Sequence, residues 1–173
     1  MNAPGKGVVG GIAGGIAMTL AMSAGRRAGL LHKTLAEDAE DWLDRTAATR
    51  RHLGRGGTTA LEQMFHLAAA AGFGLGYGLL RSRFPRTPGL VLGSAYGAAL
   101  YTVNIAGVAP VLGMTEGEPK APVPVRLERL GLHLLYGVVT ALAADGLASA
   151  FGSRQARFNE RSRPLAPSSA WGA

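Results

Sequence analysis

Long apolar blocks alternate with charged segments along this chain of 173 residues. Four blocks are close to the roughly 20 residues that a helix needs to cross the ~30 Å hydrocarbon core of a bilayer. They occupy residues 7–30, 61–80, 89–113 and 127–151. The pattern therefore predicts an all-α polytopic membrane protein, in which a four-helix transmembrane bundle forms a single membrane domain over residues 1–153.

The four predicted spans form two similar pairs. Residues 7–17 and 89–99 carry the same residue at six of eleven positions, five of them glycine or alanine. The second and fourth spans both begin with Leu-Glu and soon reach a His-Leu pair, at His66 and His133. Such an internal repeat indicates two tandem helical hairpins that face the same way.

The first span has an alternative interpretation as a secretory signal. Lys6 precedes its apolar run, and Ala21-Met22-Ser23-Ala24 resembles a small-residue cleavage site. The repeat favours a retained span, because the same glycine pattern recurs in the third block.

One further amphipathic helix is predicted in the long first loop, over about residues 34–53. Thr34 with Glu37 three residues later matches a capping box, and Gly54 is expected to end the helix. Its apolar residues, Trp42 among them, share one face. Two interpretations stay open: a solvated connector, or an interfacial helix whose Trp42 dips into lipid headgroups.

Composition favours a bilayer over a water-soluble core. Apolar residues make up 47% of the chain but aromatic residues only 6%, so large core side chains are scarce. Cysteine is absent, which excludes disulfides, thiolate catalysis and cysteine-ligated metals.

The positive charges flank the apolar blocks, as is typical of the loops of a membrane protein. The net charge is +7, but the arginines flank apolar blocks, which indicates contact with lipid headgroups and argues against nucleic acid as a partner. The loop with Arg81, Arg83 and Arg86 and the tail at residues 154–173 are both rich in arginine. By the positive-inside rule we expect both termini in the cytoplasm, with a disordered tail.

Glycines repeat at four-residue spacing in three spans, which is the pattern of closely packed membrane helices. The expected packing residues are Gly7, Gly11, Gly15, Gly72, Gly76, Gly93 and Gly97. The first and third spans are the expected central partners, and a leftover glycine face would serve a homo-oligomer. At Pro110 the third span is expected either to stop, leaving through Gly113, or to break within the membrane.

Acidic residues and histidines at membrane depth are the candidate functional residues. Glu62 and His66 are four residues apart and so share a helix face, whereas Glu128 and His133 are five apart and diverge. His66, His133 and Glu62 are candidate ligands of a divalent metal, and the two histidines are also candidates for a haem iron. The alternative is that each histidine only bonds a neighbouring helix.

Asp145 is the deepest acidic residue in the fourth predicted span. A carboxylate at such depth is a candidate for a proton relay or an ion ligand, as are Glu62 and Glu128 nearer the other surface. The structural alternative for Asp145 is a pair with Arg81 or with helix-end groups near the cytoplasmic face. No Ser-His-Asp spacing indicates catalysis, so an enzyme is not expected.

Four segments of the chain carry a resemblance to a known family: Gly7 to Ala17, His66 to Gly78, Asn104 to Pro110, and Glu128 to His133, the last with one extra residue. Together they resemble the YagU-like family of bacterial inner-membrane proteins. The resemblance implies a bacterial inner-membrane location, a four-span fold and an association with acid tolerance or envelope stress.

Three kinds of function are consistent with these residues. The leading hypothesis is a non-enzymatic inner-membrane protein that handles protons or cations. The second is a metal- or haem-binding redox or enzyme subunit that uses His66 and His133. The third is a membrane anchor or scaffold within a larger complex.

Overall fold

The computed structural model describes the backbone of residues 1–31 and 35–161, with side chains up to residue 150 except residue 35. Over these residues the chain is all-helical, as predicted, and contains no strand. The helices are α1 (Ala3–Arg27), α2 (Leu35–Ala47), α3 (Thr49–Arg83), α4 (Gly89–Leu100), the π-helix η1 (Tyr101–Val108), α5 (Ala109–Val111), the 3-10 helix η2 (Glu118–Lys120) and α6 (Val123–Arg161).

Three of the described helices are long and apolar enough to cross a membrane. They are Ala3–Arg27, the continuous helix Gly89–Val111, and Val123–Ala150. Apolar helices of this length indicate a lipid bilayer as the environment. The helix α3, which contains the second predicted span, is not among them, since Glu62, Gln63 and His66 dilute the first half of that span.

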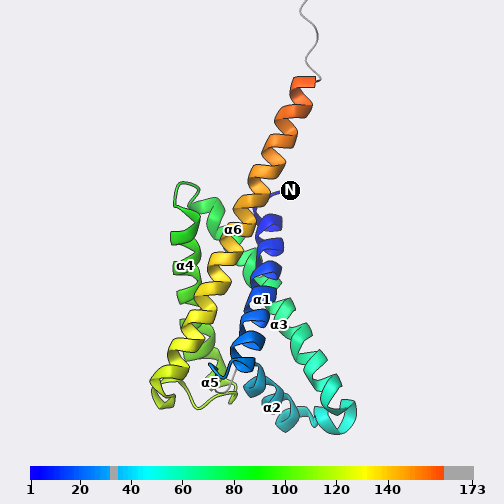
Figure 1. Cartoon of the computed structure of the whole chain (residues 1–173), viewed down its shortest axis with the longest axis vertical. Coiled ribbons are helices and arrows are strands. Elements are labelled where there is room, and N and C mark those ends of the chain that lie inside the picture. Colours follow the sequence, from blue (N-terminus) through cyan, green and yellow to red (C-terminus); the bar gives the residue numbers. More distant parts are fainter. Residues whose placement is uncertain (32–34, 162–173) are drawn as a thin grey trace, which may run out of the picture.

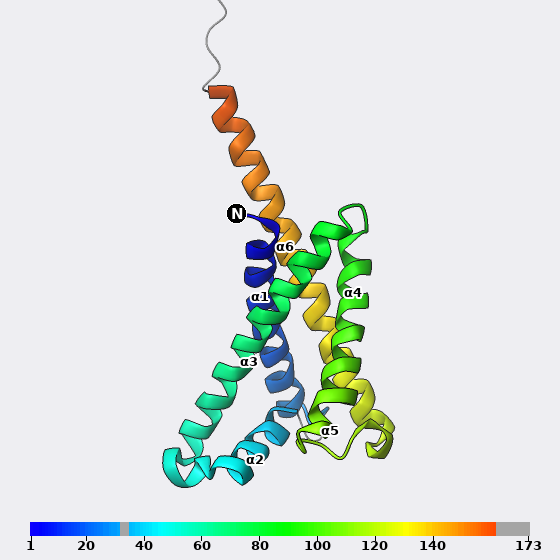
Figure 2. The same ribbon diagram turned by 180° about the vertical axis from the view of Figure 1, so that it is seen from behind.

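The helices α1 and α6 cross at the centre of the molecule, with α3 packed on α1 and α4 packed on α6 (Figures 1 and 2). The N-terminus lies at the same end as the loop of residues 84–88. At the opposite end lie α2, α5 and residues 112–122, which we call the α2 end.

Glycines bring α1 into direct backbone contact with α3. A Cβ at Gly7 or Gly11 would overlap the backbone of Gly74, and one at Gly78 would overlap the start of α1. Inside lipid, such close approach supplies the van der Waals contact that holds helices together. A Cβ at Gly72 would meet nothing within 4 Å, so the prediction that Gly72 packs is wrong. Gly72 lies two residues from Gly74, on the opposite side of the helix.

Glycines also hold α6 between α1 and α4. Gly10 and Gly14 face the α6 backbone at Thr140 and Tyr136, while Gly93 and Gly97 on α4 face other positions along α6. The first and third predicted spans are therefore not each other's main partners. Each packs through its glycines against the second or the fourth predicted span instead.

The helix that begins at Gly89 continues through Pro110 without a break. It widens into the π-helical turns of η1 and ends at Val111, after which Gly113 takes a φ of 70°. Proline has no N–H to donate, and a local π-helical adjustment accommodates this loss. The break at Pro110 is thus excluded, and the exit through Gly113 is observed.

The predicted loop helix over residues 34–53 is divided in two. Ala48, with a φ of 48° and a ψ of 40°, separates α2 from α3, and Gly54 kinks α3 with a φ of 68°. The capping residue Thr34 lies outside the described residues, as do residues 162–173 of the predicted tail. Residues 154–161 are a helical continuation of α6 rather than a disordered segment.

Candidate functional site

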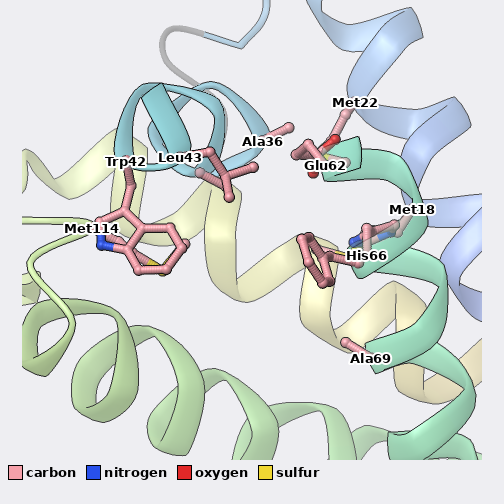
Figure 3. Close-up of a pocket in the computed structure, with 11 residues that line it drawn as sticks. Met18, Met22, Ala36, Trp42, Leu43, Glu62, His66, Ala69 and Met114 are labelled. Carbon is pink, nitrogen blue, oxygen red and sulfur yellow. The ribbon is translucent and has the colours of Figure 1, made fainter. Parts of the chain in front are cut away.

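A cavity of about 410 Å³ lies between α1, α2 and α3 near the α2 end. We call it the chamber. Its walls are Met18, Met22, Ala36, Ala39, Trp42, Leu43, Glu62, Phe65, His66, Ala69 and Met114. Figure 3 shows Glu62, His66 and Ala69 of α3 on one side, with Trp42 and Met114 opposite. A mostly apolar cavity with a few polar groups is the usual form of a small-molecule site.

Glu62 is the acidic residue of the chamber. It is only 6% exposed, and its Oε2 accepts a hydrogen bond from Gln63 Nε2 at 2.7 Å. Burying a carboxyl group in an apolar wall costs free energy, whereas an apolar side chain would fill the same place without that cost. Its position therefore marks the chamber as a candidate functional site.

A second cavity of about 160 Å³ joins the two predicted histidines. His66 and His133 both line it, together with Asn104 and Tyr136. His66, Met18 and neighbouring Ala69 also belong to the chamber, so the two cavities share a wall. The two histidines that stand at corresponding positions of the sequence repeat therefore line one cavity.

Hydrogen bonds orient both imidazole rings. His66 Nε2 lies 3.3 Å from the carbonyl oxygen of Gly15, and His133 Nδ1 lies 2.8 Å from that of Arg129. Because a carbonyl only accepts, each of these nitrogens donates its proton. In the neutral rings, Nδ1 of His66 and Nε2 of His133 are then the acceptors.

The remaining parts of the predicted metal site do not come together. Among the described residues, no group of three or more histidine, aspartate or glutamate side chains is placed to hold a metal ion. Glu62 and His66 share one cavity, and His66 and His133 share the other. Glu128 is half-buried on α6 and lines neither cavity.

Asp145 forms an ion pair with Arg81 near the N-terminus. Arg81 Nε donates to Asp145 Oδ1 at 3.1 Å, and Arg81 Nη1 donates to the carbonyl oxygens of Phe84, Pro85 and Thr87. The pair therefore holds the loop that joins α3 to α4. This arrangement corresponds to the structural alternative for Asp145.

A buried ion cluster at the α2 end was not identified from the sequence. Arg129, which is 8% exposed, donates to Asp38 Oδ2 at 3.0 Å and to Glu118 Oε1 at 2.7 Å. Tyr101 also donates its hydroxyl proton to Glu118. The available signal was an arginine inside the fourth predicted span, where a charge requires a partner.

Further contacts hold α2 over the chamber. Trp42 Nε1 donates to the carbonyl oxygen of Leu112 at 2.8 Å, Arg26 of α1 pairs with Glu37, and Arg50 of α3 pairs with Asp41. With Asp38 and Leu43 buried as well, α2 is part of the packed structure. One face of this amphipathic segment is therefore packed on the bundle, while Arg45, Thr46 and Ala47 at its end are exposed.

Together, these observations define an all-helical protein with three apolar helices of membrane-spanning length and an apolar chamber around a buried glutamate. No model of a known protein family matches the chain, and no curated protein or solved structure matches it either.

Proposed function

We propose that this protein is a four-span protein of the bacterial inner membrane that handles protons or cations at Glu62. The observation that carries the proposal is the burial of the Glu62 carboxyl group in the wall of the chamber. Of the three acidic candidates, Asp145 is paired with Arg81 and Glu128 lines neither cavity. Asp145 also lines a cavity, of about 260 Å³, but it is paired there with Arg81. Glu62 is thus the acidic candidate that lines a cavity without an ion pair to a lysine or arginine of the described residues.

Equivalent glycine contacts support the two tandem hairpins. Gly11 packs on the carbonyl group of Ala70, and Gly93, its counterpart in the repeat, packs on that of Gly137. These contacts join α1 to α3 and α4 to α6 in the same register. If α6 spans the membrane, its counterpart α3 is expected to span it too, with its polar face covered by α1 and the chamber.

The histidines occupy equivalent positions in the two hairpins. Gly15 of α1 lies beside His66, and its counterpart Gly97 of α4 lies beside His133. The hairpins also differ at several positions of the repeat. At one of them, Gly14 lets α1 approach α6, whereas its counterpart Tyr96 stands between α4 and α3. The Tyr96 hydroxyl donates to an α3 carbonyl at 2.6 Å.

Glu62, His66 and His133 form a series of titratable groups. The first two line the chamber, and the last two line the second cavity. Carboxyl and imidazole groups both exchange protons, so the series supports proton movement from the chamber toward the centre of the bundle.

Proton handling can be measured in liposomes that contain the purified protein and a trapped pH-sensitive dye. An imposed pH gradient is expected to decay faster with the wild-type protein than in protein-free vesicles. Glu62→Gln removes the titrating group with little change in shape, so decay is expected to return to the protein-free rate.

Glu128→Gln is the matched control, because it makes the same change outside both cavities. It is expected to retain wild-type decay. If the wild-type protein does not accelerate decay, or if Glu62→Gln accelerates it as much as wild type, Glu62 is not a proton-handling residue.

Metal or haem binding is the second candidate, supported by the two histidines on one cavity. A histidine whose Nδ1 donates to a carbonyl presents Nε2 as an acceptor, which is how metal-bound histidines are commonly oriented. The visible spectrum and metal content of the purified protein test it. A haem absorbance band or a stoichiometric metal, lost in both His66→Ala and His133→Ala, would favour this function.

Membership of the YagU-like family and a role as a membrane anchor or scaffold in a larger complex remain predictions from the sequence.

A further inference from the structure

We propose that the chamber binds a lipophilic organic cation, which pairs with the Glu62 carboxylate. This inference rests on the proposed function and names the class of cation that Glu62 handles.

The charged side chains of the chamber favour a cation. Glu62 is its acidic residue, and among the described residues that line it there is neither lysine nor arginine. An ionised carboxyl group that is buried without a cationic partner is costly, and a bound cation would offset this cost. An anionic ligand would instead face the Glu62 carboxylate, with His66 as the titratable base among the described lining residues.

The walls select against a small inorganic ion. Hard cations such as Ca²⁺ require about six to eight oxygen ligands, whereas the chamber offers the Glu62 carboxyl group amid methionine, alanine and leucine side chains. An organic cation carries its charge inside an apolar shell. Such an ion is bound by one carboxylate and a large apolar surface. The chamber provides both, with Glu62 in the mostly apolar wall of a cavity of about 410 Å³.

Aromatic residues supply a second attraction for a cation. Trp42 and Phe65 both line the chamber, and Trp42 stands across it from Glu62 and His66 (Figure 3). The hydrogen bond from Trp42 Nε1 to Leu112 fixes the position of the indole. The electron-rich face of an aromatic ring attracts a cation, and the attraction is stronger when the cation is desolvated.

Phe65 marks the access route. It lines the chamber and is also 59% exposed on the outer surface of α3, next to the exposed Met64. In a bilayer this surface faces lipid, so a ligand dissolved in the membrane reaches the chamber past Phe65. This route suits a lipophilic cation and not a hydrated ion.

Proton exchange follows from the same pairing. When Glu62 is protonated, the arriving cation displaces the carboxyl proton, which leaves to water. The other titratable groups near this carboxyl are His66 on α3 and Glu40 on α2, whereas α1 contributes Met18 and Met22 to the chamber. Cation binding is therefore expected to weaken as the pH falls.

Tetraphenylphosphonium and tetraphenylborate provide the test, because they have nearly the same shape and opposite charge. Binding of each to the detergent-purified full chain is measured by equilibrium dialysis. The cation is expected to bind saturably, and the anion at least tenfold more weakly. Glu62→Gln is expected to weaken binding of the cation at least tenfold, while Glu128→Gln leaves it unchanged.

Equal binding of the two ions, or cation binding that Glu62→Gln does not alter, would overturn the proposal. Trp42→Ala and Trp42→Phe give a second measurement that retains Glu62: the phenylalanine variant is expected to bind the cation more tightly than the alanine variant. Size-exclusion profiles show whether each variant is folded. If the pH gradient still decays through Glu62 but tetraphenylphosphonium does not bind, this inference fails and the proposed function stands.

Discussion

At the residue scale, the position of a glycine on its helix decides what it does. Gly11 and Gly72 belong to the same kind of four-residue pattern in the sequence. In the structure, a Cβ at Gly11 would overlap Ala70 and Gly74, whereas one at Gly72 would meet open space. A local pattern identifies small residues but not the direction in which they face, because that direction depends on where the partner helix lies.

Gly11→Leu is expected to destabilise the protein strongly, and Gly72→Leu is expected to have little effect. The leucine at position 11 would force α1 and α3 apart, at a cost of about 1–3 kcal/mol or more. Thermal unfolding in detergent measures the difference. Equal midpoints for the two variants would contradict the observed packing of α1 on α3.

At the scale of elements, ion pairs to neighbouring elements hold α2 in place, and α2 is not one of the apolar helices of membrane-spanning length. The buried cluster of Arg129, Asp38 and Glu118 joins α2, η2 and α6, which are far apart in the sequence. The amphipathic pattern of α2 was visible in the sequence, and so was its row of acidic residues. The partners of those acidic residues could not be identified from the sequence, because Arg129 lies 91 positions from Asp38.

Arg129→Met is expected to release α2 from the bundle. Methionine keeps much of the volume but removes the cation between two buried carboxyl groups, and breaking a buried pair in this way costs about 3–5 kcal/mol. Hydrogen exchange of the α2 backbone amides is expected to accelerate by a factor on the order of 100 or more.

Arg83→Met is the control, since Arg83 is exposed at the other end of the molecule. It is expected to leave exchange in α2 unchanged. Protection of α2 that survives Arg129→Met would show that the other contacts of α2 hold it without the cluster.

At the scale of the whole molecule, the spanning of α3 decides the topology. Three of the described helices are long and apolar enough to cross a membrane by length and composition, and α3 is not one of them. Within its apolar stretch, Glu62 and His66 line the chamber and His66 also bonds α1, so the average composition understates how apolar the remaining surface of this stretch is. If α3 spans, residues 51 and 86, which lie before and after its apolar stretch, are on opposite sides of the membrane.

Single cysteines test this directly, because the chain has none of its own. In intact cells, Arg51→Cys is expected to react with a membrane-impermeant maleimide, and Arg86→Cys only after the cells are opened. Labelling of both residues from the same side would show that α3 does not span. The reverse pattern would retain four spans and invert the orientation.

The sequence by itself determined the helical class, the apolar helices and the repeat of glycine and histidine positions, since each is a local pattern along one helix. Only the tertiary structure decided that Gly74 and Gly78 pack while Gly72 does not, that Arg81 pairs with Asp145, and that α2 covers Glu62. These features depend on how helices distant in the sequence face one another. For the same reason, the chamber around Glu62 became visible only when α1, α2 and α3 were brought together.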